Sequence, residues 1–314
     1  MEEKKPETLY HYCSTDTFYE IIKSKSLRLS DITKSNDSQE LKWVFTRFKE
    51  DFSSSYLHKY GQANNVEVYK KVLEYADGIF QNSYVCCFSK DRDSLSQWRG
   101  YAADGTGLSL GIDASSIYDT STSSIKLLKV EYGETTQKDF IAQNVTKLVS
   151  RDIGEITDQV IFDVLFELLE KATQYKHHSF YTENEYRFVY TTSLGKGSLS
   201  YYYEKRSEAN KNTNLAKKEE KPSIKSYIDL CLNQGFSSAG LDLSPLSIRK
   251  DNLVSYYDLG FRRIKDTFIR EVIIGPKCKL DRDDILLFLH ALGYDLDAMI
   301  DKGFSISKSD STYT

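Results

Sequence analysis

Two glutamates and an arginine at alternate positions form the most chemically suggestive pattern in the sequence. Glu183, Glu185 and Arg187 lie within Phe180–Tyr190, whose aromatic and β-branched residues predict a strand. Alternate residues of a strand share a face, so the three charged side chains are expected on one side of it. Charges on an otherwise apolar strand are costly unless they are solvated, paired or used. The pattern therefore allows either an exposed face with a Glu–Arg pair or a site for acid–base chemistry.

A polar and aromatic segment, Ser94–Tyr101, could bind a ligand together with these glutamates. Trp98 and Tyr101 could stack on a planar ring, and Arg99 could meet a pyrophosphate. The structural alternatives are aromatic residues packed in the core and an ion pair of Arg99 with Asp104 or Asp113.

The bulk composition is that of an ordinary globular protein. The chain has 314 residues, of which 40% are hydrophobic and 28% charged, enough for a sizeable core. The net charge of −4 gives no general attraction to phosphate backbones, so nucleic-acid binding would need a local basic patch. One such concentration exists, although surface cations beside strands are usually only solvated; its members are Arg262, Arg263, Lys265, Arg270, Lys277 and Lys279.

The cysteines and histidines do not form a metal-binding pattern. The five cysteines include no CxxC pair, which fits reduced thiols in the cytoplasm. His177 and His178 are adjacent, so their side chains diverge, and no third ligand is visible. Neither an apolar leader nor an 18-residue apolar window occurs, so we expect a cytoplasmic protein without a membrane span and without a metal.

The order of expected elements favours an α+β fold in one domain, residues 1–314. Strands are expected at Leu9–Tyr12, Leu27–Ser30, Ser83–Ser89, Gly107–Ile112, Ile125–Tyr132, Tyr181–Tyr190, Ser198–Tyr203, Leu253–Leu259 and Phe268–Ile274, with a last edge strand in Phe304–Thr314. Apolar residues at helical spacing predict helices around Leu41–Phe52, Val66–Phe80 and Asp281–Leu292, and a helical insertion at about 135–176. The stretch at about 204–221 is nearly devoid of apolar residues and predicts a mobile loop.

Four blocks together resemble a widespread prokaryotic family of unknown function. In chain order they read LYHYCSTDTFYEIIKSKSLRLS, CCFSKDRDSLSQWRGYAADGTGLSLGI, FYTENEYRFVY and FIREVIIGP. The hallmarks of that family are a WxxYA…G segment and an ExExR strand. This resemblance names no activity by itself.

The first block and the ExE pair are also similar to ADP-ribosyltransferases, most of all to DNA-modifying toxins of toxin–antitoxin pairs. The resemblance implies a split β-sheet that holds NAD in a cleft, with Glu185 as the catalytic carboxylate. His11 would bind the ribose or the nicotinamide amide. The second-strand residue would be Ser30, with Arg28 or Tyr12 as alternatives, and the basic residue would be Arg99 or Arg187.

The resulting hypothesis is an NAD-dependent ADP-ribosyltransferase that modifies a nucleic acid or a protein, as a toxin or anti-phage effector with a neutralising antitoxin. Glu185 would stabilise the positive charge that develops on the ribose, and Glu183 would orient or deprotonate the nucleophile. The alternatives are an NAD glycohydrolase, a non-catalytic module that binds a nucleotide or a partner, and, more remotely, a glycosidase using the same carboxylate pair.

Overall fold

The computed structural model describes residues 7–34, 38–61, 66–79, 83–116, 125–191, 247–249, 252–254 and 256–313. The predicted mobile loop at about 204–221 and the predicted strand Ser198–Tyr203 lie outside these residues.

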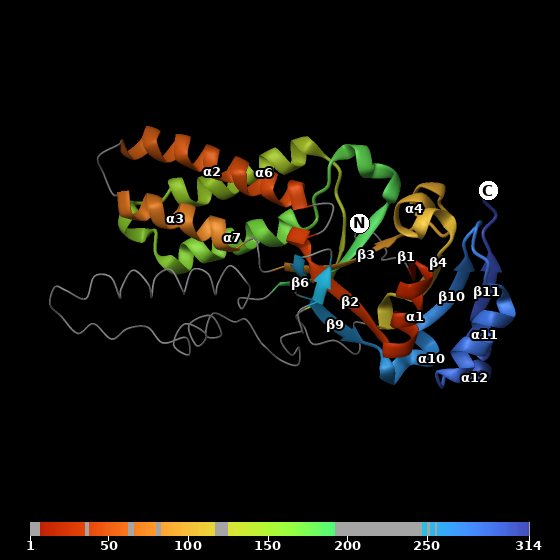
Figure 1. Ribbon diagram of the computed structural model, residues 1–314. Coiled ribbons are helices and arrows are strands. Elements are labelled where there is room, and N and C mark those ends of the chain that lie inside the picture. Colours follow the sequence, from red (N-terminus) through yellow and green to blue (C-terminus); the bar gives the residue numbers. More distant parts are fainter. Residues whose placement is uncertain are drawn as a thin grey trace.

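A mixed nine-stranded sheet runs through the described part of the chain (Figure 1). Seven strands follow one another in the order β11-β10-β4-β1-β3-β2-β9, while β6 pairs with β3 and β5 pairs with β6. The neighbours are antiparallel except β10 and β11, which are parallel. The strands are β1 (Thr8–Cys13), β2 (Ser26–Asp31), β3 (Ser83–Ser89), β4 (Leu108–Asp113), β5 (Ile125–Lys129), β6 (Glu185–Thr191), β9 (Tyr256–Gly260), β10 (Ile269–Ile274) and β11 (Ser305–Lys308). A separate hairpin joins β7 (Ser247–Arg249) and β8 (Asn252–Val254).

The sheet divides at β3. One edge of β3 pairs with β6 along its whole length, from Ser83 opposite Thr191 to Ser89 opposite Glu185. The other edge is shared: β1 pairs at Ser89, and β2 pairs at Tyr84 and Val85. The strands β1 and β2 therefore diverge from opposite ends of β3.

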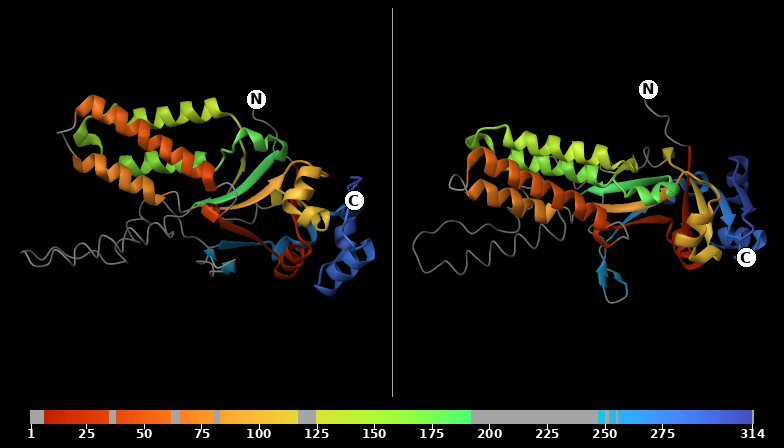
Figure 2. Two further views of the ribbon diagram at one scale, coloured as in Figure 1. Left: turned by 45° about the horizontal axis from the view of Figure 1, so that its top comes forward. Right: turned by 90° about the horizontal axis from the view of Figure 1, so that it is seen from above.

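Four helices form a bundle at one end of the molecule, and α11 and α12 lie at the opposite end (Figures 1 and 2). The bundle consists of α2 (Ser38–Tyr60), α3 (Val66–Ile79), α6 (Glu134–Val149) and α7 (Asp158–Ala172). The other helices of the described residues are α1 (Thr15–Ser24), α4 (Leu95–Tyr101), α10 (Lys265–Phe268), α11 (Arg282–Ala291) and α12 (Leu296–Asp301), with 3₁₀ turns η1 (Ile32–Lys34), η3 (Ala103–Gly105), η4 (Ile153–Glu155), η5 (His178–Glu183) and η6 (Arg262–Ile264).

The central strands separate two hydrophobic cores. Tyr186 and Phe188 of β6 face the core that contains α1, whereas Val189 faces the core of the helical bundle. This alternation follows from the period of two along a strand. Because both faces of β6 are buried, every polar side chain on this strand must find a partner inside the protein.

The α+β class predicted from the sequence is confirmed. The expected helical insertion at about 135–176 corresponds to α6, η4 and α7, and the expected edge strand near the end of the chain is β11. The segment Ser94–Tyr101 becomes helix α4 after Ser94. The expected strand Leu253–Leu259 corresponds to two strands, β8 and β9.

Gly107 lies where the backbone before β4 closely approaches the end of β1 and the residue after α4. A Cβ atom at Gly107 would lie 2.1 Å from the carbonyl oxygen of Cys13 and 3.0 Å from that of Ala102. These are backbone atoms, so the clash cannot be relieved by a rotamer change. We expect Gly107→Ala to lower the free energy of unfolding by about 3 kcal/mol, measured by urea denaturation.

Gly100→Ala is the matched control, because no heavy atom lies within 4 Å of the added carbon and the residue is helical. Its stability should stay within about 1 kcal/mol of the natural protein, with a gain favoured by helix propensity. Equal stabilities of the two variants would contradict this packing.

Candidate functional site

The segment before β6 is not the strand that the sequence predicts. Phe180–Glu183 belong to the 3₁₀ turn η5, which His177 caps by accepting a hydrogen bond from the Ser179 amide. Asn184 then adopts a left-handed conformation, with φ 45° and ψ 53°, that asparagine tolerates better than most residues. The predicted strand over Phe180–Glu183 is therefore wrong, and β6 begins at Glu185. Glu183 does not share a strand face with Glu185.

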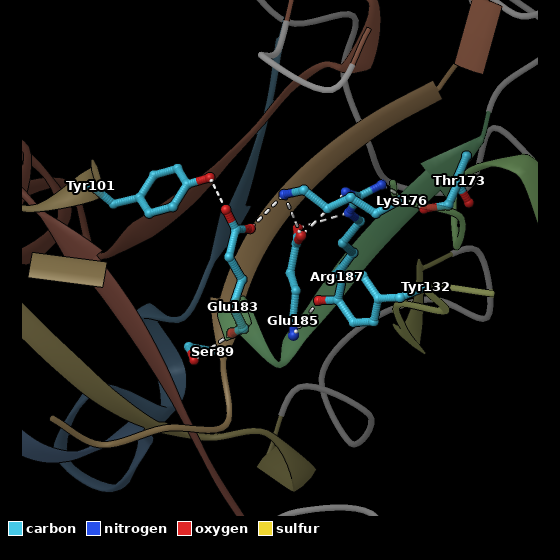
Figure 3. Close-up of polar contacts among 8 residues, drawn as sticks. All are labelled: Ser89, Tyr101, Tyr132, Thr173, Lys176, Glu183, Glu185 and Arg187. Atoms are coloured by element: carbon cyan, nitrogen blue, oxygen red, sulfur yellow. Dashed lines mark hydrogen bonds and ion pairs between the residues drawn. The ribbon is translucent and has the colours of Figure 1, made fainter. Parts of the chain in front are cut away.

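The two glutamates nevertheless meet, because Lys176 lies between them (Figure 3). Its Nζ donates to Glu183 Oε2 at 2.5 Å and to Glu185 Oε2 at 2.9 Å. The lysine is 1% exposed, and both carboxylates are buried. An ammonium group buried to this extent is stable only when it is paired, and here it pairs with both candidate catalytic residues.

Arg187 completes the network from the other side. Its Nε donates to Glu185 Oε1 at 2.8 Å and its Nη2 to Glu185 Oε2 at 3.2 Å, while Nη1 donates to the Thr173 carbonyl at 2.8 Å. The four side chains carry two positive and two negative charges, so the buried cluster is electrically balanced. We call Lys176, Glu183, Glu185 and Arg187 the charged cluster.

The charged cluster fixes the ionisation of Glu185. Burial raises the pKa of Glu185, but the guanidinium of Arg187 and the ammonium of Lys176 outweigh burial and lower the pKa to about 2. Glu185 is thus an anion at neutral pH whose two oxygens are both hydrogen-bonded by cations.

Neighbouring hydroxyl groups fix the backbone of both glutamates. The Glu185 amide donates to the hydroxyl of Tyr132 at 3.0 Å, and the hydroxyl of Ser89 donates to the Glu183 carbonyl at 2.7 Å (Figure 3). Burial raises the pKa of Tyr132 to about 12, so it remains a neutral phenol. The carboxylates are therefore held by both main-chain and side-chain contacts.

Glu183 is the member of the cluster that connects to the surface. Its Oε1 accepts a hydrogen bond from the Tyr101 hydroxyl at 2.9 Å, and Tyr101 is 38% exposed. Phe180, whose ring lies 5.0 Å from Lys176 Nζ, and Tyr181 are also exposed. Tyr101 and Phe180 therefore bring partly exposed aromatic rings into contact with the charged cluster.

Other residues predicted to bind a ligand support the loop between β3 and α4. The hydroxyl of Tyr12 donates to the Asp91 carbonyl at 2.8 Å and accepts from the Ser94 amide at 3.0 Å. Trp98 is fully buried, packs edge-on against Tyr12, and donates from Nε1 to Asp93 at 2.5 Å. Trp98 therefore has no exposed face for stacking in this structure.

His11 and Ser30 are not brought to the glutamates. The ring of His11 lies 5.5 Å from that of Phe88, in the core with α1, on the face of the sheet opposite Glu185. His11 donates from Nδ1 to the Cys87 carbonyl at 2.9 Å, and burial lowers its pKa despite this bond, which favours the neutral imidazole. Ser30 pairs with Val85, which pairs with Val189, four residues along β6 from Glu185.

Arg28, the alternative candidate for the second-strand residue, contacts residues of β9. Its guanidinium stacks 3.7 Å from the centre of the Tyr256 ring and pairs with Asp258. Arg99, predicted to meet a pyrophosphate, is exposed and lies 5.9 Å from the Tyr313 ring.

Half of the basic concentration seen in the sequence, three of its six residues, forms ion pairs. Lys265, Arg270 and Lys277 form ion pairs with Asp266, Asp113 and Asp104 respectively. Arg262 and Arg263 are exposed on η6. Among the described residues, no group of three histidine, cysteine or acidic residues could hold a metal ion, and no helix is long and apolar enough to cross a membrane.

Lys176 and Tyr132 are members of the site that sequence reasoning missed. Lys176 follows the apolar stripe of α7, where a lysine is normally read as a solvated end of a helix. The nearby Glu183 and Glu185 are the signal in the sequence that Lys176 could be buried as an ion-pair partner. The turn η5 is needed, however, to bring both carboxylates to the one ammonium group.

A family model described as "Protein of unknown function (DUF2971)" matches residues 97–188. The matched stretch begins within α4 and ends within β6, so it includes Tyr101 and the whole charged cluster. No curated protein and no solved structure is significantly similar to this chain.

The charged cluster predicts a specific dependence of stability on pH. The pKa of Glu185 is lower in the folded protein than its ordinary value, so ionised Glu185 stabilises the fold above about pH 4.5, and this stabilisation is lost as the pH falls toward 2. The shift corresponds to about 3 kcal/mol. Glu185→Gln should therefore be less stable than the natural protein at pH 7, and the difference should shrink below pH 4.5.

The measurement is urea denaturation of both proteins at several pH values between 7 and 3. Other carboxylates also titrate in this range, so the difference between the two proteins is the relevant quantity. Glu20→Gln, a substitution of an exposed glutamate on α1, is the control and should leave the whole profile unchanged. A pH-independent difference between the natural protein and Glu185→Gln would refute the ion pairing.

Proposed function

We propose that this protein is an NAD-dependent ADP-ribosyltransferase that modifies a macromolecule at the surface beside Tyr101, whose hydroxyl bonds the buried Glu183. The observation that carries the proposal is the hydrogen bond between the half-exposed Tyr101 and Glu183, whose other oxygen is held by the buried Lys176. This arrangement presents a fixed carboxylate at the edge of an aromatic surface. The division of the sheet at β3 is in keeping with a split-sheet enzyme, although it carries less weight.

The reaction needs such a carboxylate. When the bond between nicotinamide and ribose breaks, its electron pair leaves with the nicotinamide, and positive charge develops on the ribose. A preorganised carboxylate beside the ribose stabilises this charge and contributes roughly 3–4 kcal/mol to the transition state. The incoming hydroxyl or amine must also lose a proton, which a carboxylate can accept.

In this proposal Glu183 is the carboxylate that reaches the ligand. Both oxygens of Glu185 are held by the buried cations Arg187 and Lys176, so it would act by holding Lys176. One oxygen of Glu183, by contrast, is held by the neutral hydroxyl of the partly exposed Tyr101. Lys176 in turn would keep Glu183 in place. This proposal differs from the expectation from the sequence, in which Glu185 contacts the ribose.

The exposed rings suit the nicotinamide group. Oxidised nicotinamide is a planar cation, and aromatic faces attract planar cations by stacking and by cation–π interaction. Tyr101 and Phe180 flank Glu183 and Lys176, and both rings are partly exposed. Neutral nicotinamide loses the cation–π attraction once the bond is cleaved, which favours its departure.

Substitutions in the cluster should separate catalysis from folding. We expect Glu183→Gln to lower kcat/KM for nicotinamide release from NAD by about 10²–10³-fold, because the amide cannot stabilise the developing charge. Tyr101→Phe should lower it by roughly 3–10-fold through loss of one hydrogen bond. The assay combines nicotinamide release with transfer of labelled ADP-ribose to cellular RNA, DNA and proteins.

The exposed substitution Glu20→Gln is the matched control, and each variant should be checked for a cooperative unfolding transition. Release of nicotinamide without a labelled acceptor would identify an NAD glycohydrolase instead. Binding of NAD by calorimetry without turnover would identify a non-catalytic module. Neither binding nor turnover by the natural protein would overturn the proposal.

We also propose a biological setting for this activity, in which the protein is a cytoplasmic toxin or anti-phage effector restrained by a neutralising partner. Production of the natural protein in a bacterium should slow growth at least 10-fold more than production of Glu183→Gln at equal protein level. Growth curves with matched immunoblots test this expectation. Equal growth with both proteins would argue against a toxic role.

A further inference from the structure

The segment Ser309–Tyr313, which follows β11, contacts the loop before α4. The hydroxyl of Ser309 donates to Asp93 Oδ1 at 2.7 Å, and the amide of Asp310 donates to Asp93 Oδ2 at 2.7 Å. The same Asp93 accepts the indole hydrogen bond of Trp98, the central residue of α4. The beginning of α4 is therefore tied to this segment through one carboxylate.

The same segment also contacts the turn after α4. The hydroxyl of Tyr313 donates to Asp104 Oδ1 at 2.7 Å, and Lys277, which pairs with Asp104 at 3.0 Å, lies 3.7 Å from the centre of the Tyr313 ring. These hydrogen bonds lower the pKa of Asp104 and keep it charged. We call Ser309–Tyr313 the clamp segment, because it holds both ends of α4.

The turn that the clamp segment holds has an unfavourable backbone conformation. Ala103, Asp104 and Gly105 have φ values of 48°, 57° and 86°, so three consecutive residues lie in the left-handed region. Only glycine adopts this region without steric cost, and runs of it are rare. Such a conformation persists only where surrounding contacts impose it.

Tyr101 is the last residue of α4, and only Ala102 separates it from this turn. Its position is thus set by anchors on either side, Asp93 and Asp104, both of which the clamp segment contacts. Tyr101 in turn holds the surface-facing oxygen of Glu183. A chain of hydrogen bonds therefore connects Ser309–Tyr313, through Asp93, Asp104 and Tyr101, to the proposed catalytic carboxylate.

We infer that the clamp segment is a positioning element that holds Tyr101 against Glu183 and thereby sets the affinity of the site for its nicotinamide-bearing ligand. The inference deepens the proposed function and rests on it for the ligand, but the contact that it concerns exists without any ligand. Loss of the clamp segment releases the left-handed turn, and α4 then no longer presents Tyr101 to Glu183.

The test uses the full chain with 3-fluorotyrosine placed only at position 101. In Tyr313→Ala, the ¹⁹F resonance should move to the position that it has in Glu183→Gln, where the contact is altered directly. Hydrogen exchange of residues 95–107 should accelerate at least 10-fold, while exchange in the bundle helices stays unchanged. The KM for NAD should rise about 5-fold with a smaller change in kcat.

Three further variants make the result specific. Tyr313→Phe keeps the ring on Lys277 but removes the hydrogen bond to Asp104, so it should give an intermediate shift. Thr312→Ala, at an exposed position in the same segment, should behave like the natural protein. In a Tyr101→Phe background, Tyr313→Ala should change the KM for NAD by less than 2-fold, because the clamp acts through the lost hydroxyl.

An unchanged ¹⁹F resonance in Tyr313→Ala would overturn the inference, as would an undiminished KM effect of this substitution in the Tyr101→Phe background. If the natural protein shows no activity on NAD, the proposed function fails, while the resonance and the exchange rates still decide whether the clamp segment positions Tyr101. The two failures are therefore distinguishable.

Discussion

The candidate site depends on one buried ammonium group. Lys176 lies between Glu183 and Glu185, two acidic residues that would repel each other without it. Burying an ion is costly, and removing one partner from a buried pair typically costs about 3–5 kcal/mol. Arg187 supplies the second positive charge, so the cluster is balanced, and it bonds the Thr173 carbonyl next to α7. Arg187 therefore balances the charge of the site and, through the same guanidinium, links β6 to the end of α7.

The position of β6 explains why the cluster can be buried. This strand pairs with β3 on one edge and with β5 on the other, and hydrophobic cores cover its two faces. Tyr186 and Phe188 pack in one core while Val189 packs in the other. Glu185 and Arg187 share the bundle-side face with Val189, and their burial strengthens the hydrogen bonds between them. Because both side chains are buried, Glu185 and Arg187 form hydrogen bonds with each other instead of with solvent.

Much of the fold and part of the site follow from the sequence. Apolar periodicity predicts α2, α3, α11 and most strands, because burial of one face dictates the spacing of apolar residues. The ExExR pattern correctly identifies Glu183, Glu185 and Arg187 as neighbours. It assigns the wrong geometry to Glu183, because the left-handed conformation of Asn184 depends on its hydrogen bond to Asp91, 93 residues away. The burial of Trp98 likewise depends on Tyr12 and Ile273, which are distant in sequence, and the amide of Lys176 bonds the Glu131 carbonyl; local patterns do not encode these contacts.

The contacts of the site differ greatly in sequence separation, and this difference affects the order in which they form during folding. The charged cluster forms within residues 176–187, whereas Tyr101 meets Glu183 across 82 residues and Tyr313 meets Asp104 across 209. Closing longer loops costs more chain entropy and slows the formation of the contacts that depend on them. In a chain synthesised from its amino end, the ion cluster can form before residues 309–313 exist. The contacts of Ser309 and Tyr313 with Asp93 and Asp104 are then added after the ion cluster, so the support of Tyr101 is completed later than the charges that Tyr101 contacts.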